Sequence, residues 1–376
     1  MATQSLAQIT IIIPTVARPE FVRRQFAYWG ETDANVFILD GADKPIAIPS
    51  AETAQNVRYI HTGTKFNERL ATASQFVKTK YAALLPDDEF YLPSGLRACM
   101  DRLDTDSSIV GCVGRSLYFF VDQGRFLVSD AYRDWKPFTD GCVDIGHRLD
   151  EDLPPNKTHK AQFGVFRSEI WNVIFERSYG RYFSCGYTYE RLINLQRTVS
   201  GRTEILESVL WMRSKENPPI SNESVPRVAG RDFVSWARNP EFAGEHAEYR
   251  QIARNIIESG GVGSARAAEF EERFFVGGIH RQATKEVRNS RRLKNRLGTL
   301  MLTRTPKTLR LFAKRYLPSA ALGFTGWEGH DLDKMCASLT ARGTQFSRAE
   351  LDKVESLSLE MDMQLRGTVK KGLPNG

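Results

Sequence analysis

Short apolar runs recur along the first third of the chain, and segments with helical spacing separate them. The runs predict strands over residues 9–13, 36–40, 57–61, 81–85 and 108–120. Helices are predicted from about Pro19, where proline suits a first turn, over residues 65–80, and over residues 92–103. Strands alternating with helices in this way predict an α/β fold with a mostly parallel, Rossmann-like sheet flanked by helices.

The second half of the pattern is less regular. Residues 160–175 read as a strand that turns into a helix, 186–201 as a helix stopped by Gly201, and 203–214 as a strand. Residues 150–159 read as a loop. The proline-rich stretch "KENPPISNESVP" after Ser214 suggests a boundary, and the chain beyond it is mainly helical.

Polar residues follow three of the predicted strands. These segments are 14–18, 40–44 and 87–89, and the last is the acidic tripeptide Asp87-Asp88-Glu89 after "YAALLP". Parallel α/β sheets bind ligands beyond the carboxyl ends of their strands, so the three segments should meet at one ligand-binding edge. A solvated acidic turn that caps the following helix would explain the tripeptide equally well on its own.

The order of these features resembles the GT-A-fold glycosyltransferases, in particular the family-2-like group, over residues 8 to 215. The resemblance rests on Pro14, Thr15, Arg18 and Pro19 after the first strand, and on Asp40 at the end of the second. It continues through "YAALLPDDEF", "FGVFRSEIW", "GYTYERLINLQR" and "ILESVLWMRS". It implies a catalytic domain over 1–220, with a nucleotide-sugar-binding half (1–115) and an acceptor half (116–220), followed by a helical C-terminal extension over 221–376.

The family's Asp-x-Asp motif is altered in this chain. In a gapless alignment Pro86 takes the place of the first Asp and Asp88 that of the second, which is usually a direct metal ligand. The resemblance therefore implies a divalent cation, Mg²⁺ or Mn²⁺, held by Asp88 with Glu89 or Asp87. Such hard cations need only one or two carboxylates, and they stabilise a diphosphate leaving group as Lewis acids.

The resemblance also assigns the remaining site residues. Donor binding falls to Pro14, Thr15, Arg18, Asp40, Arg69, Asp87 and Arg213. Glu190 stands where the family carries the general base of an inverting transfer, but Arg191 follows it where a second acid could stand. If Glu190 is not the base, a retaining mechanism gains support.

Composition suggests the cellular compartment of the protein and reveals one segment of unusual charge. Five widely spaced cysteines form no CxxC pair, which fits a reducing cytoplasm, and neither a signal peptide nor a membrane-spanning run is apparent. The net charge of +7 is concentrated in residues 281–315, which carry +11, so the rest of the chain sums to −4. This tract fits attachment to the anionic inner face of a membrane, or a helical cap with solvated charges; nucleic acid is not expected, because no recognised binding module accompanies it.

The sequence thus predicts a cytoplasmic, metal-assisted glycosyltransferase with a nucleotide-sugar donor and a glycan or lipid-linked saccharide acceptor, peripheral to the membrane if the basic tract attaches it. The competing interpretation is a nucleotide- or sugar-binding protein on a degenerate GT-A scaffold. Pro86 and Arg191 are the features in its favour.

Overall fold

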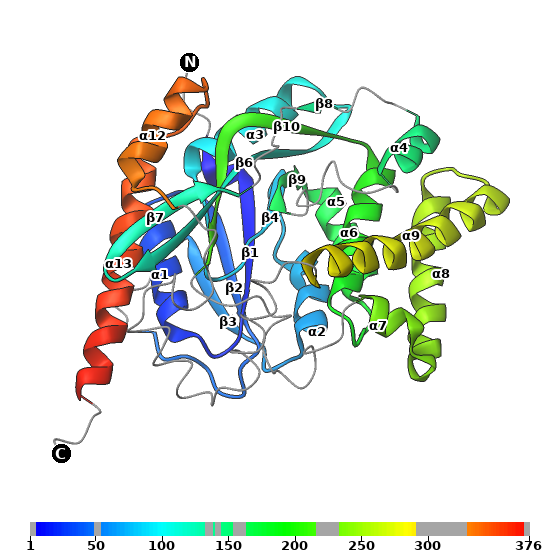
Figure 1. Ribbon diagram of the computed structural model, residues 1–376, viewed down its shortest axis with the longest axis horizontal. Coiled ribbons are helices and arrows are strands. Elements are labelled where there is room, and N and C mark those ends of the chain that lie inside the picture. The colour runs from blue at the N-terminus through cyan, green and yellow to red at the C-terminus, as the bar shows by residue number, and fades with distance from the viewer. Residues whose placement is uncertain are drawn as a thin grey trace.

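The computed structural model describes residues 5–48, 54–131, 138–139, 144–152, 163–215, 233–290 and 329–371. Within them, one sheet lies between two layers of helices (Figure 1). The strands are β1 (Ile9–Thr15), β2 (Asn35–Asp40), β3 (Val57–His61), β4 (Tyr81–Leu84), β5 (Phe90–Tyr91), β6 (Ile109–Asp122), β7 (Arg125–Asp130), β8 (Phe138–Thr139), β9 (Val165–Arg167) and β10 (Arg202–Ser214). The helices are α1 (Pro19–Trp29), α2 (Phe66–Ala71), α3 (Pro93–Thr105), α4 (Ile145–Asp152), α5 (Ser168–Tyr179), α6 (Tyr187–Ser200), α7 (Phe233–Arg238), α8 (Ala243–Ser259), α9 (Ser264–Ser290), α12 (Leu332–Ala341) and α13 (Arg348–Lys371).

The sheet has the order β3-β2-β1-β4-β9-β6-β10-β5, with β7 on β6 and β8 on β10. Strands β1, β2, β3 and β4 pair in parallel, and the antiparallel β9 links them to β6 and β10, which are parallel to each other. The main strands therefore share one direction. This is the GT-A-type, Rossmann-like arrangement with a C-terminal helical extension that the sequence predicted.

Both faces of the central strands are buried, which explains their unbroken apolar runs. Ile11 and Ile13 point into one core, together with residues of α1, α3, α12 and α13. Ile12 points into the other core, together with residues of α5, α6, α8 and α9. The side chains of one strand thus alternate between the two helical layers.

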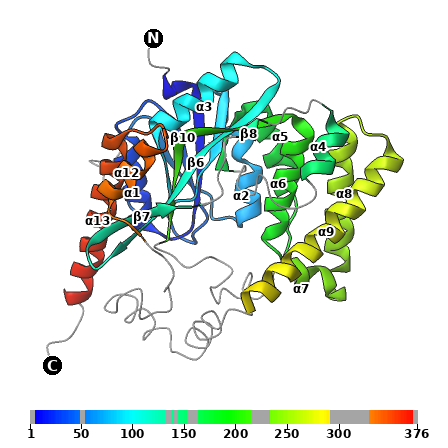
Figure 2. The ribbon, with the colours of Figure 1, turned by 45° about the horizontal axis from the view of Figure 1, so that its top comes forward.

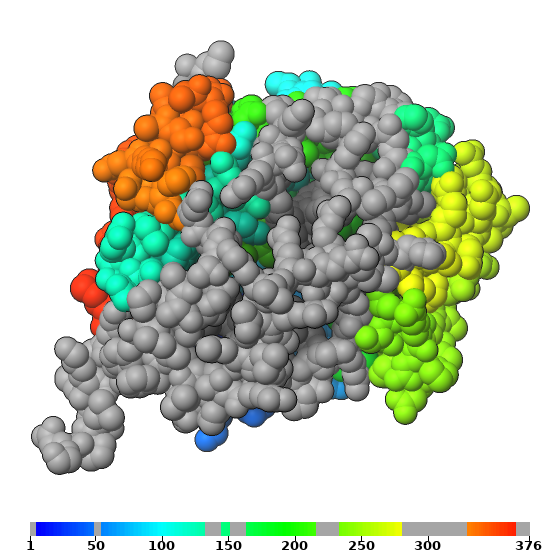
Figure 3. Space-filling model, in the orientation of Figure 1, coloured from blue at the N-terminus to red at the C-terminus, as the bar shows by residue number. Residues whose placement is uncertain are grey.

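The described helices of the extension pack in two separate places (Figures 1 and 2). Helices α7, α8 and α9 cover α6 on one side of the sheet, whereas α12 and α13 lie against β7 and α1 on the other. The space-filling view shows α12 and β7 at one margin of the molecule and α8 and α9 at the opposite margin (Figure 3).

Two predictions about individual elements need correction. The helix expected over residues 65–80 ends at Ala71, because the Thr72 hydroxyl bonds the carbonyl oxygen of Arg69 and a short 3-10 turn follows. The loop expected over 150–159 starts inside α4, which runs to Asp152, and its other residues lie outside those described.

The role expected for the basic tract of the extension remains a prediction. Of the basic tract 281–315, only the backbone of 281–290, which continues α9, lies within the described residues. In the described part of the chain, no helix is both long enough and apolar enough to cross a bilayer.

Candidate functional site

The predicted ligand-binding edge is formed by the carboxyl ends of β1, β2 and β4. Thr15 pairs with Asp40 in the β1–β2 register, and Asp40 pairs with His61 of β3. The Leu85 amide, just after β4, donates to the Ile12 carbonyl over 2.9 Å. The acidic turn that follows therefore lies beside Thr15, as the sequence predicted.

Asp87 is at the centre of this edge. Its buried carboxylate accepts hydrogen bonds from the Thr15 hydroxyl (2.6 Å) and from the Arg18 guanidinium (2.5 Å). Burial raises the pKa of Asp87 to about 6 although Arg18 opposes the shift, since a charged carboxylate loses hydration there. The same guanidinium lies 3.5 Å from the Asp88 carboxylate, so Arg18 bridges the two acids.

Helix α1 holds the backbone of the acidic turn. The Gln25 amide donates to the carbonyl oxygens of Asp87 (2.9 Å) and Glu89 (2.8 Å), and the Arg24 guanidinium donates to that of Asp88 (2.9 Å). Sequence reasoning did not include Arg24 or Gln25, because two adjacent polar residues in an amphipathic helix look like ordinary surface residues. Their burial is apparent only once α1 packs against the acidic turn.

Asp40 connects the loops after β1 and β2. One carboxylate oxygen accepts from the backbone amides of Ala42 (2.9 Å) and Ala17 (3.4 Å), and the other from the Tyr59 hydroxyl (2.6 Å). Ala17 has a φ of 52°, a conformation that a non-glycine residue adopts only when its surroundings hold it there. Burial and the bond to Asp40 raise the pKa of Tyr59 to about 12. Asp40 therefore shapes the edge of the site.

Arg69 is a buried cation of the edge, and its guanidinium lies at Gly41, the residue after Asp40. Its side chain is 2% exposed, and burial lowers its pKa while the charges of Asp40 and Asp87 oppose the shift. It donates to the Thr64 carbonyl over 3.1 Å, whereas its buried Nε has no hydrogen-bond partner among the described residues. The absence of a side chain at Gly41 admits the guanidinium, because a Cβ there would lie 1.3 Å from an Arg69 nitrogen.

Glu89 and Arg213 form the far side of the acidic turn. The Arg213 Nε lies 3.7 Å from a Glu89 oxygen, and the same guanidinium donates to the Tyr118 hydroxyl over 3.1 Å. It also lies over the rings of Tyr118 and Trp211. Arg213, predicted from the end of the last strand, thus joins the acidic turn through Glu89.

The edge is balanced in charge. Four carboxylates (Asp40, Asp87, Asp88 and Glu89) lie among four guanidinium groups (Arg18, Arg24, Arg69 and Arg213). An entering diphosphate would leave the edge negative, so a divalent cation that enters with it would restore the balance. The oxygen donors of Asp88 and Glu89 suit Mg²⁺ or Mn²⁺, although each now faces an arginine. Among the described residues, no three His, Cys, Asp or Glu side chains group around a common metal position.

Glu190 lies apart from the acidic turn, in the first turn of α6. Burial and, to a smaller extent, the negative charge of Glu190 raise the pKa of Tyr179. Tyr179 in turn contacts Phe66 of α2, whose ring lies 5.7 Å from the Arg69 guanidinium. The ring of Tyr189, the residue before Glu190, stacks on Tyr179 at 5.1 Å, so a layer of aromatic residues extends from the first turn of α6 to the edge.

Arg191 has a structural role at the position where a second acid could stand. Its guanidinium lies between the rings of Phe233 and Phe274, at 4.5 and 4.3 Å, and donates to the Tyr249 hydroxyl over 3.0 Å. It also donates to the Phe274 carbonyl. The residue after Glu190 therefore fastens α6 to the helices of the extension.

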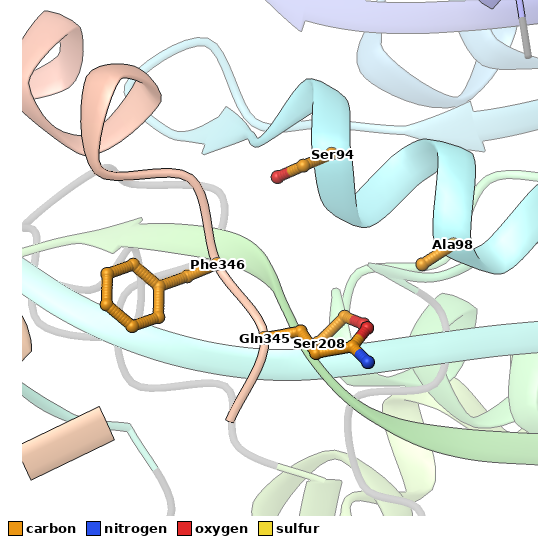
Figure 4. Close-up of a pocket in the computed structure, with 5 residues that line it drawn as sticks. All are labelled: Ser94, Ala98, Ser208, Gln345 and Phe346. Carbon is orange, nitrogen blue, oxygen red and sulfur yellow. The ribbon is translucent and has the colours of Figure 1, made fainter. Parts of the chain in front are cut away.

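Pro14 is the second-last residue of β1 and pairs with Leu39 of β2, so it lies at the edge beside Thr15. A cavity of about 140 Å³ lies elsewhere, between α3, β10 and the segment before α13, and is lined by Ser94, Ala98, Ser208, Gln345 and Phe346 (Figure 4). A second, of about 610 Å³, lies between α1, α3 and α13. Neither is lined by a predicted site residue, so both mark where the extension meets the sheet domain.

The chain has a GT-A-type fold by its strand order and the position of its polar edge. No protein-family model matches it, and no curated protein matches it. Among solved structures, it is similar to residues 1–349 of S. aureus TarS, with 11% identity over 96% of this chain and 92% of that chain and a TM-score of 0.46. The same TarS fragment in complex with UDP-GlcNAc gives 12% identity, the same coverage and a TM-score of 0.48. These values describe a distant likeness in overall shape.

Proposed function

We propose that this protein is a glycosyltransferase that moves a sugar from a nucleotide-sugar donor to a glycan or lipid-linked saccharide acceptor, with inversion. One observation carries the proposal. The carboxyl edge of a GT-A-type sheet gathers four carboxylates and four guanidinium groups, and one of the four is that of the buried Arg69, whose Nε lacks a hydrogen-bond partner among the described residues.

The donor would bind along the edge from β2 to the acidic turn. Asp40 would recognise the nucleotide base or hold the loop that does so, with Thr15 and Pro14 beneath base and ribose. Arg18, Arg69 and Arg213 would meet the diphosphate, since guanidinium groups match phosphate oxygens in charge and geometry. Asp87, whose two oxygens already accept hydrogen bonds, would hold Arg18 in position.

A divalent cation fits the donor set of Asp88 and Glu89. When bound, it would stabilise the negative charge that develops on the departing diphosphate. Arg18 and Arg213, which now face these carboxylates, would then be available to the phosphate oxygens.

In an inverting transfer, an acceptor hydroxyl oxygen attacks the anomeric carbon as the bond from that carbon to the diphosphate breaks. The proton of the hydroxyl passes to a base, for which Glu190 is the candidate. Its neighbour Arg191 cannot serve, because a guanidinium does not give up its proton and this one is packed between two rings.

The competing function, binding without turnover, is favoured by Pro86 in place of the first acid of the motif. Release of free nucleotide from a panel of nucleotide sugars separates the two. UDP-GlcNAc should be tested first, and each nucleotide sugar should be assayed both with and without Mn²⁺. A transferase should hydrolyse its donor slowly without acceptor and faster with one. Donor binding with no nucleotide release under any condition would establish the binding protein instead.

A further inference from the structure

We propose that Phe66, Tyr182 and Tyr187 form a platform on which a sugar ring of the acceptor stacks. This inference rests on the proposed transferase function and assigns the acceptor-binding surface that the function requires. In the described part of the chain, these three are the aromatic residues that are exposed, at 44%, 45% and 36%. They come from the start of α2, the loop before α6 and the start of α6.

The segment that carries Tyr182 lies beside the rings under Phe66, because the Tyr189 hydroxyl donates to the Arg181 carbonyl (3.0 Å) and accepts from the Phe183 amide (2.9 Å). The Lys65 ammonium lies 5.3 Å from the centre of the Tyr182 ring, and Lys65 directly precedes Phe66. The Phe66 ring meets those of Tyr179 and Tyr189 edge to face, at 5.8 and 6.4 Å, and these two stack on each other at 5.1 Å. The Phe66 ring is therefore the outer surface of a packed aromatic layer, and Tyr182 and Tyr187 belong to the chain segment that supplies Tyr189 to this layer.

The platform lies between the residues proposed to bind the donor and the residue proposed as the base. The Arg69 guanidinium contacts Phe66 from the donor side. On the other side, Tyr187 and Glu190 are three residues apart on α6, so they share a helical face with about 5–6 Å between their Cβ atoms. A sugar stacked on these rings would lie between the donor edge and the candidate base.

The exposed area fits a sugar better than a protein. If a whole aromatic side chain presents about 200 Å², the exposed fractions leave about 250 Å² in all. A stable protein partner needs about 800 Å² on each side, whereas this area matches one or two pyranose rings. A pyranose has an apolar C–H face and a polar rim, and here the rings are flanked by the Lys65 ammonium and the Glu190 carboxylate.

Saturation-transfer NMR with chitotriose and maltotriose tests the platform without knowledge of the natural acceptor. The wild-type protein should transfer saturation to the ring C–H protons of at least one probe. Tyr182→Ala and Phe66→Ala should each reduce that transfer by about tenfold, as expected for the loss of one stacking ring. Tyr182→Phe, which keeps the ring, and Met363→Ala, an exposed apolar residue of α13, should retain it.

A nucleotide titration of the same variants distinguishes failure of the platform from failure of the proposed function. If the wild type binds nucleotide but neither sugar, or if the alanine variants bind sugar as the wild type does, the platform is overturned and the donor site stands. If sugar stacks and depends on the rings while no nucleotide binds, the platform stands and the transferase proposal falls.

Discussion

The donor edge, at the carboxyl ends of β1, β2 and β4, and the α2–α6 face, which carries the aromatic platform, are held together by different kinds of contact. At the edge, the contacts are hydrogen bonds and ion pairs of 2.5–3.7 Å, in which the buried Thr15, Asp87 and Glu89 meet the partly exposed Arg18, Asp88 and Arg213. At the α2–α6 face, the contacts are between aromatic rings, and three of the rings are partly exposed. A site of fixed charges suits a ligand of constant charge such as a diphosphate, whereas an open aromatic face suits acceptors that differ in their hydroxyl pattern.

If this division holds, a change on the α6 side should affect turnover and leave donor affinity intact. Glu190→Gln keeps the shape of the side chain and removes its basicity. Turnover should fall by about 10²–10⁴-fold, the usual contribution of a general base. Single-turnover transfer, with donor affinity measured separately by calorimetry, checks this. Transfer within about threefold of wild type would place the base elsewhere or favour a retaining mechanism.

On the donor side, Asp88 should decide the dependence on a cation. Asp88→Ala should weaken the Mn²⁺-dependent part of donor binding by at least about tenfold, since even residues that only orient metal ligands contribute that much. Asp87→Ala and Glu89→Ala should each weaken the Mn²⁺-dependent binding of the donor by a smaller factor. Binding that is unchanged by EDTA in the wild-type protein would show that Arg18 and Arg213 compensate the diphosphate without a cation.

A smaller effect separates two roles for Asp40. Asp40→Asn keeps an oxygen for the amides of Ala17 and Ala42 but cannot accept from the Tyr59 hydroxyl as the carboxylate does. If the charge recognises the base, the donor's KM should rise by about tenfold with little change in kcat. Tyr59→Phe is the matched control, because it removes the same hydrogen bond and leaves the charge. Equal effects in both variants would mean that Asp40 acts only through the loop.

The last prediction concerns stability, not binding or turnover. The pKa of Asp87 is raised from 3.8 to about 6, so between these values the folded protein holds a proton that the unfolded chain has lost. Stability should therefore fall as pH rises from about 4 to about 6, by up to roughly 3 kcal/mol at about 1.4 kcal/mol per pKa unit. Denaturant unfolding at pH 4 and pH 7 should show this loss in wild type and not in Asp87→Asn. The same loss in both proteins would assign it to other groups.

The two regions also differ in how far the sequence predicts them. Thr15, Asp40 and Asp87 were predicted together because strand ends in a parallel sheet meet at one edge, and the register brings them there. The contacts of Gln25 depend on the packing of α1 against the acidic turn, and those of Arg191 on the packing of α6 against the extension. No local sequence pattern encodes either arrangement. Helix α2 is shorter than its apolar spacing predicted, because the Thr72 side chain competes for a backbone carbonyl.

The aromatic platform could not be predicted from the spacing of apolar residues in the sequence either. Phe66 reads as the first apolar residue of an amphipathic helix, which normally points into the core. Only the packing of α2 against Tyr179 and Tyr189 shows that this ring is covered on one side and open on the other.

Calorimetric titration with UDP, GDP and ADP, each with Mn²⁺, tests the central claim most directly, because it depends on the donor edge and on no knowledge of the acceptor. The account predicts that one of these nucleotides binds the wild-type protein and binds Arg69→Met at least about tenfold more weakly, since Met fills much of the same volume without the charge. Failure of all three to bind, or equal affinity for wild type and Arg69→Met, would contradict the account.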